Sequence, residues 1–245
     1  MVTPLAHGRL LVQADSAPVV GIEALCGGAP GGVLALVPHP DDESLAMGAA
    51  IATAARAGRP VAVACVTTGN RSHRSTRCPP DRLARLRRRE LRIASAHLGA
   101  TCVIWLGHDD QRAPPRFDDA DSATLRAACG RLGVGAVWTC WRGDPHSDHN
   151  AVARAADDFC SRAGLPPPVE APVWGRFIDN APVAGQLVRL APSPAAASAK
   201  ARAIAAHRSQ MTGLIPDDPD GFVMDPATQA HFRDSDELFL LPGPP

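Results

Sequence analysis

The sequence has no net charge, because 25 Lys and Arg residues balance 25 Asp and Glu residues. A balanced chain exerts no general attraction on nucleic acid or on an anionic membrane, so we expect neither as a partner. The sequence also lacks an apolar run near the roughly 18 residues that a membrane-spanning helix needs. Its N-terminus has no basic start followed by an apolar stretch, as a secretory signal would. These absences favour a cytoplasmic protein that acts on a small polar molecule, and they leave its oligomeric state open.

Paired cysteines and a glycine-rich phosphate loop are missing as well. The seven cysteines are odd in number and scattered, without a CxxC pair. This usage is typical of reduced thiols in the cytoplasm rather than of a disulfide framework. The first predicted strand-to-helix junction has no G-x-G-x-x-G string, which argues against a dinucleotide-binding protein.

What the chain does contain is a repeated strand–loop–helix pattern. Apolar runs without alternation predict strands that are covered on both faces, at residues 33–37, 61–66, 102–106 and 136–139. Helical spacing predicts a helix after each strand, at residues 44–56, 81–98, 122–132 and 151–163. The repeat predicts an α/β fold, a Rossmann-like and mostly parallel sheet with helices on both faces.

We expect one domain at residues 31–245, preceded by an N-terminal extension at residues 1–30 that packs on the surface. Beyond residue 168 the pattern weakens, and it indicates a further strand at residues 183–190 and a helix at residues 195–209.

Two clusters of histidine and acidic residues follow the first and the fourth predicted strand. The first is His39-Pro-Asp-Asp-Glu43 and the second is His146-Ser-Asp-His149. Ligands of open α/β sheets bind beyond the carboxyl ends of the strands, so both clusters can face one cleft. A catalytic zinc ion takes His nitrogen and carboxylate oxygen from three residues and keeps one position for water. Together the two clusters predict a metal site.

Each cluster taken alone has a simpler interpretation. Pro-Asp-Asp-Glu is typical of a turn and a helix N-terminus, where the helix dipole favours acidic side chains. A single His-x-Asp-His string is often a polar loop. Their occurrence at equivalent strand ends favours the metal site. Two other functions stay open: a sugar-binding protein without catalysis, and a metal-dependent hydrolase of a different amide or ester.

The strand–PHPDDE–helix string and the later HSDH resemble the LmbE/PIG-L superfamily of zinc N-deacetylases, known for N-acetylglucosaminyl substrates. The resemblance covers roughly residues 33–240, and the segments 82–91 and His207-Arg-Ser-Gln210 are also similar to family patterns. It implies a hydrolase that removes the N-acetyl group from an N-acetylglucosamine-type sugar or glycoconjugate. Thr68-Gly-Asn70 departs from the acidic residues that often follow the second strand in this family.

By this resemblance His39, Asp42 and His149 bind the metal. We expect Zn²⁺, although two imidazoles and one carboxylate also suit iron, cobalt or nickel. Asp41 is then the general base that takes a proton from the attacking water.

The resemblance also implies that His146 stabilises the oxyanion or protonates the leaving amine, and that Asp148 orients His146. Arg87 and Asp110 occupy positions that contact the substrate in some members. The other arginines of residues 85–89 fall mostly on the solvated side of a helix with a buried leucine stripe, so they do not indicate nucleic-acid binding.

Overall fold

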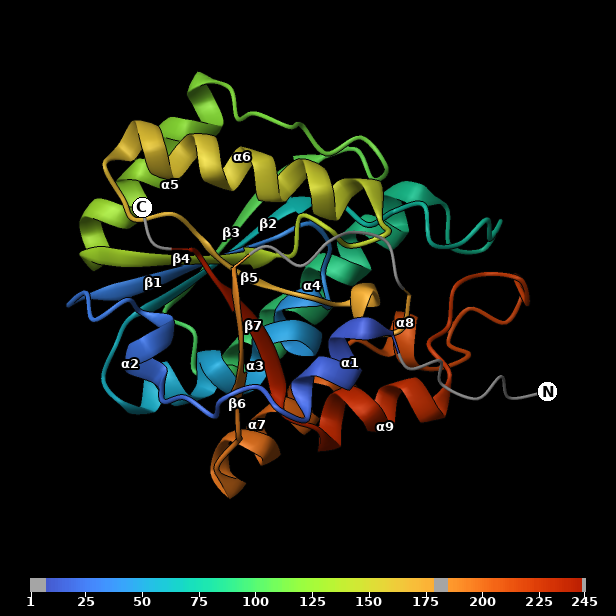
Figure 1. Cartoon of the computed structure of the whole chain (residues 1–245). Coiled ribbons are helices and arrows are strands. Elements are labelled where there is room, and N and C mark those ends of the chain that lie inside the picture. Colours follow the sequence, from blue (N-terminus) through green and yellow to red (C-terminus); the bar gives the residue numbers. More distant parts are fainter. Residues whose placement is uncertain (1–7, 179–184, 244–245) are drawn as a thin grey trace.

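A seven-stranded sheet forms the centre of the molecule (Figure 1). The structure is a computed structural model, and it describes residues 8–178 and 185–243. The strands are β1 Gly32–Val37, β2 Val61–Thr67, β3 Cys102–His108, β4 Val134–Cys140, β5 Val169–Ala171, β6 Gln186–Leu190 and β7 Glu237–Leu241. Across the sheet they are ordered β3-β2-β1-β4-β5-β7-β6. Strands β1 to β5 are parallel to one another, whereas β7 runs antiparallel to β5 and β6.

Helices cover both faces of this sheet, as Figure 1 shows. One face carries α5 Asp119–Leu132 and α6 Ser147–Ala163, and the other carries α3 Asp42–Arg56, α4 Pro80–Leu98, α7 Pro194–Ala206 and α9 Pro226–Asp234. The shorter elements are α1 Arg9–Ala14, α2 Ile22–Leu25, α8 Arg208–Met211 and a 3-10 helix at Trp174–Arg176. Within the described residues, the helices are too short or too polar to cross a membrane.

Strand β1 explains why the apolar runs do not alternate. Its successive side chains point to opposite faces of the sheet. Val33, Ala35 and Val37 join the core beneath α3, while Leu34 and Leu36 join the core beneath α5 and α6. Both faces are buried, so each position of the strand is apolar or glycine.

The four predicted strand–helix units are confirmed, as is the mostly parallel sheet with helices on both faces. The sequence pattern does not predict β5, which has only three residues, or β7 near the C-terminus. The strand predicted at residues 183–190 is found from Gln186, and residues 183 and 184 lie outside the described residues. The helix predicted at residues 195–209 is instead two helices, because His207 leaves the helical conformation (φ −81°, ψ 55°).

Residues 8–31 contribute to the packed domain instead of lying only on its surface. Leu25 of α2 is fully buried in the same core as α3. The Trp138 indole N–H donates to the Leu25 carbonyl oxygen at 2.8 Å. Val19 forms an isolated bridge with Arg189 of β6.

Candidate active site

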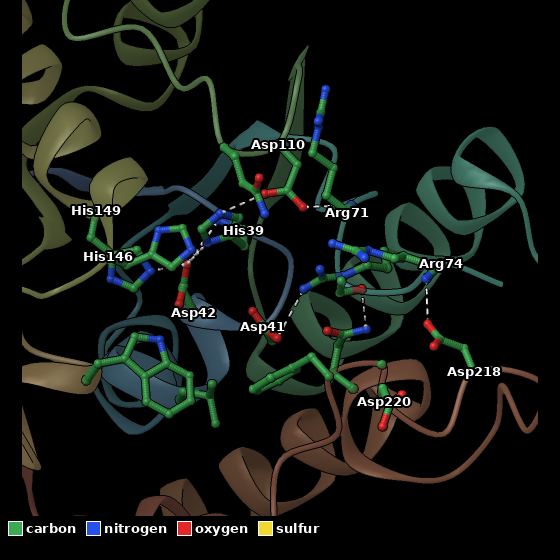
Figure 2. Close-up of a pocket in the computed structure, with 18 residues that line it drawn as sticks. His39, Asp41, Asp42, Arg71, Arg74, Asp110, His146, His149, Asp218 and Asp220 are labelled. Carbon is green, nitrogen blue, oxygen red and sulfur yellow. Dashed lines mark hydrogen bonds and ion pairs between the residues drawn. The ribbon is translucent and has the colours of Figure 1, made fainter.

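The predicted site residues lie where the chain leaves β1 and β4. These two strands are parallel neighbours, so the residues that follow them leave the sheet at the same edge. His39 and Asp41 lie in the turn after β1, and α3 begins at Asp42. His146 is the N-cap of α6, and His149 lies in the first turn of that helix. Figure 2 shows these side chains around one cavity.

The three predicted metal ligands lie together and are buried. Asp42 Oδ2 lies 3.2 Å from His39 Nδ1 and 3.5 Å from His149 Nε2. Ligand atoms about 2.0–2.1 Å from a tetrahedral zinc ion are roughly 3.4 Å apart, which is close to these two separations. Among the described residues, three sets have donor atoms that all lie within 4.8 Å of one another: His39 with His146 and His149, Asp42 with Cys140 and His149, and His39 with Asp110 and Asp148. The His39 backbone N–H also donates to Asp42 Oδ2 at 3.0 Å and fixes this carboxylate at the start of α3.

Each of the two imidazoles turns its other nitrogen to a buried carboxylate. His39 Nε2 lies 3.0 Å from Asp148 Oδ2, and His149 Nδ1 lies 2.8 Å from Asp144 Oδ2. Each ring thus has a carboxylate at both of its nitrogens. With a metal ion beside Asp42, the proton of each ring would stay on the nitrogen that faces Asp148 or Asp144, and the other nitrogen would supply its lone pair to the ion. These residues therefore fit a metal ion by the chemistry of their donor atoms.

The pKa values of His39, Asp42 and His149 reflect how closely these groups and their neighbouring carboxylates lie. Burial would lower the pKa of His39, but the carboxylates around it raise that pKa well above its usual value. Burial would raise the pKa of Asp42, but His149 and His39 hold it well below its usual range. The pKa of His149 is raised by Asp42 and Asp144, against the effect of burial. Without a cation the imidazoles tend to take up protons, which a bound divalent ion would displace.

His146 lies beside both imidazoles. Its ring centroid is 4.7 Å from that of His39 and 5.0 Å from that of His149. The Asp148 backbone N–H donates to His146 Nδ1 at 3.2 Å, so the neutral ring carries its proton on Nε2. Burial and the two neighbouring imidazoles lower the pKa of His146 to about 4. The ring is therefore a neutral hydrogen-bond donor at the wall of the cavity.

The expected role of Asp148 is not what its hydrogen bonds indicate. Its carboxylate contacts His39 and accepts the backbone N–H groups of Gln111 at 2.8 Å and Ala113 at 3.1 Å. The Asp148 hydrogen bond to His146 comes from its backbone N–H, because the His146 side chain caps the start of α6. The Asp148 carboxylate makes no hydrogen bond to His146 among the described residues, so its expected orienting role stays a prediction. Asp148 fixes the ring of His39 and anchors the loop after β3.

Asp41 has a rare backbone conformation and a displaced pKa. Its φ of 137° is one that residues other than glycine seldom adopt. Its Oδ2 accepts a hydrogen bond from Arg87 Nη2 at 3.1 Å. Burial raises the pKa of Asp41 to about 6, although the Arg87 charge opposes the rise. A cavity-lining carboxylate with a pKa near neutrality is suited to general-base catalysis.

The cavity has a volume of about 660 Å³, within the range of small-molecule sites. Arg87 and Asp110, the two predicted substrate contacts, both line it. Asp110 also accepts the Arg71 backbone N–H at 2.8 Å and lies 3.3 Å from His39 Nε2. Trp174 and Phe222 meet edge to face with their centroids 5.9 Å apart. The other lining residues are mostly polar and include Ser72, Arg74, Gln111, Gln210, Asp218 and Asp220 (Figure 2).

Two residues of this site carry no assignment from the sequence. Asp144 accepts the backbone N–H groups of Val173 and Gly175 besides contacting His149, so it connects the cluster to the segment after β5. Its only sequence signal is its position, shortly before the second cluster and after a strand. Cys140 ends β4, and its sulfur lies within 4.8 Å of ligand atoms of Asp42 and His149.

Known proteins match this chain over much of its length. The PIG-L family model, described as GlcNAc-PI de-N-acetylase, matches residues 34–160. The chain is also 28% identical over 194 residues to the probable N-acetyl-alpha-D-glucosaminyl L-malate deacetylase 2 of Bacillus cereus. That alignment covers 76% of this chain and 86% of the relative.

Solved structures share the fold at lower sequence identity. The A40926 pseudoaglycone deacetylase matches with a TM-score of 0.62 and 19% identity, over 85% of this chain and 96% of that one. The 4-carboxy-2-hydroxymuconate hydratase of Pseudomonas putida KT2440 matches with a TM-score of 0.53 and 20% identity, over 72% of this chain and 78% of that one. A fold shared with a hydratase does not decide the reaction. The family model, in contrast, spans just over half of the sequence and includes both clusters of the site, and this chain therefore belongs to the PIG-L family of deacetylases.

Proposed function

We propose that this protein is a metal-dependent N-deacetylase that removes the N-acetyl group from an N-acetylglucosamine-type sugar or glycoconjugate. One observation supports the proposal above all. His39 Nδ1 and His149 Nε2 lie 3.2 and 3.5 Å from the same Asp42 oxygen, and the Asp41 carboxylate lines the same cavity. Amide hydrolysis needs this combination of a cation site and a base. The substrate class is supported by the family description and by the Bacillus cereus relative.

His39, Asp42 and His149 would hold the ion, with zinc as the expected metal. When bound, a divalent ion lowers the pKa of water and polarises the amide carbonyl. Asp148 and Asp144 hold the two rings by their other nitrogens, so the nitrogens beside Asp42 would be the ones that bind the ion.

Asp41 takes the proton of the attacking water. Arg87 holds its Oδ2, while its Oδ1 has no hydrogen-bond partner among the described residues and is free for the water. A pKa of about 6 leaves Asp41 ionised at neutral pH and still basic enough to accept a proton. Asp41 then gives this proton to the amine nitrogen as the C–N bond breaks. The products are acetate and the free amino sugar.

His146 donates its Nε2–H to the carbonyl oxygen as negative charge develops there. The ring is neutral, because its pKa is about 4 and its Nδ1 accepts a backbone N–H. A second proton on Nδ1 would face the Asp148 N–H across 3.2 Å. Of the two roles expected for His146, oxyanion stabilisation is therefore better supported than protonation of the amine.

A sugar-binding protein without catalysis has less support. A binder needs no buried carboxylate that is held in a costly backbone conformation beside a cation site. A different amide or an ester could use the same residues, so the substrate is the part of the proposal that most needs an experiment.

Acetate release from a panel of N-acetylglucosamine conjugates, followed by mass spectrometry, tests the proposal. Protein stripped by a chelator should release no acetate, and reloading with zinc should restore the release. Asp41→Asn should bind zinc and remain inactive. A zinc-loaded wild-type protein that deacetylates no conjugate of the panel, or that works equally well when stripped, would overturn the proposal.

A further inference from the structure

The backbone of Asp41 is held by a buried side chain that does not reach the cavity. The Asp41 N–H donates to Glu43 Oε2 at 3.0 Å, and the Asp41 carbonyl accepts the N–H groups of Ser44 and Leu45 at 2.9 Å each. A φ of 137° is strained for a residue other than glycine and persists only where the surroundings enforce it. Glu43 is fully buried and is absent from the cavity lining. It can therefore influence the chemistry only through its neighbours.

Glu43 is held in turn by His207, which is also fully buried. His207 Nε2 lies 2.8 Å from Glu43 Oε1, and Ser44 Oγ donates to the same oxygen at 2.6 Å. His207 stands at the break between α7 and α8, where its backbone leaves the helical conformation. The break turns the ring toward Glu43. Two irregular backbone positions, at Asp41 and at His207, thus meet at one carboxylate.

We propose that Glu43 and His207 are positioning residues for Asp41. They hold it in the conformation that lets Asp41 and Asp42, which are adjacent in sequence, both face the cavity. Neighbouring residues at the start of a regular helix point in different directions, so the turn must depart from regular geometry. The inference rests on the proposed function, because it assumes that Asp41 is the base.

A simpler role for Glu43 is helix capping. A glutamate in the first turn that bonds back to the N-cap N–H resembles a capping box, and such a cap stabilises the helix. Such a role would change stability and leave kcat unaltered. The two roles are therefore separable by experiment.

Glu237, the first residue of β7, provides a matched control because its carboxylate binds the same helix, α3. It is fully buried, accepts the backbone N–H groups of Ala49 and Ala50 at 2.6 and 2.8 Å, and pairs with Lys200 at 2.7 Å. It does not line the cavity. Glu237→Gln therefore removes a buried, paired carboxylate that contacts α3, without a change at Asp41.

The test compares Glu43→Gln with Glu237→Gln, both loaded with zinc, at a temperature where both are folded. Glutamine offers one acceptor oxygen where Glu43 offers two, so it cannot serve the Asp41 N–H and the His207 ring together. We expect Glu43→Gln to lose about 10–100-fold in kcat on a conjugate that the wild type deacetylates, with KM and zinc affinity unchanged. Glu237→Gln should keep the wild-type kcat. A crystal structure of Glu43→Gln should show Asp41 outside the positive-φ region.

Should Glu43→Gln fail to fold, His207→Leu and His207→Gln replace it. Leucine removes the donor to Glu43, whereas glutamine retains one, so kcat should fall in the first and recover in the second. Equal activity of these two variants, an unchanged φ at Asp41 in Glu43→Gln, or equal kcat in Glu43→Gln and Glu237→Gln would overturn the inference. The φ measurement needs no substrate, so an inactive wild type would refute the proposed function and leave this test intact.

Discussion

Substitutions of the two adjacent carboxylates, Asp41 and Asp42, should affect different properties of the protein. Asp42 Oδ2 lies beside a ring nitrogen of both His39 and His149, whereas Asp41 accepts a hydrogen bond from Arg87 and lines the cavity. We therefore expect Asp42→Ala to lose metal and Asp41→Asn to keep it. Asparagine is the suitable replacement at position 41 because it tolerates positive φ better than most residues and retains an oxygen for Arg87.

The expected magnitudes follow from these roles. Loss of a general base costs about 10²–10⁴-fold in rate, or roughly 3–5 kcal/mol of transition-state stabilisation, so Asp41→Asn should fall by this amount in kcat/KM. Loss of a supporting carboxylate typically costs about 10–100-fold in metal affinity, and loss of a direct ligand should cost more. Asp42→Ala should thus need a large excess of zinc, and its activity should partly return at high zinc concentration.

Two measurements decide the matter. Metal content after gel filtration, by elemental analysis, and a zinc titration of the stripped protein give the affinity. Acetate release at saturating zinc gives kcat/KM. An Asp41→Asn protein that loses zinc, beside an Asp42→Ala protein that retains it, would show that ligand and base have been exchanged.

Three further predictions concern the surroundings of the cluster. Asp144→Asn should weaken zinc binding about 10–100-fold in a titration, because it removes the carboxylate that fixes the His149 tautomer. The kcat/KM of the wild type should fall as the pH drops through the pKa of Asp41, which is about 6 without metal and lower with a cation nearby, and Asp41→Asn should lose this limb. Glu237→Gln should lower the free energy of unfolding in urea by about 3–5 kcal/mol, because Lys200 stays buried without its partner, and adding Lys200→Met should recover part of the loss.

The sequence predicts the parts of this molecule that follow from local chemistry. The unbroken apolar run that becomes β1 indicates a strand buried on both faces, and the structure confirms it. The positions of His39 and His149 after two such strands predict that they meet, because parallel neighbours end at one edge. Asp41 and Asp42 follow His39 closely in the sequence, so they are predicted to lie at the same edge of the sheet.

Contacts that depend on side-chain direction could not be predicted in this way. The N-terminal turn of α6 gives Asp148 two different contacts, since its backbone N–H donates to the N-cap residue His146 while its carboxylate contacts His39. Nothing in the string His-x-Asp-His indicates which of these neighbours the carboxylate prefers. The contact of Asp144 with His149 could not be predicted either, because α6 begins between these two residues and its direction is not known from the sequence. His207 looks like part of a continuous helix until Glu43 is known to lie opposite it.

Arg87 shows how a residue expected at the substrate also supports the base. Its Nη1 donates to the Gly69 carbonyl and its Nη2 to the Pro40 carbonyl and Asp41 Oδ2, while its Nε has no partner among the described residues. Gly69 has a φ of 60°, and a Cβ there would lie 2.4 Å from Arg87 Nη1, so only glycine lets the chain approach. The Gly69 carbonyl in the loop after β2 thus gives Arg87 a neutral acceptor. The guanidinium charge of Arg87 beside Asp41 limits how far burial can raise the pKa of the base.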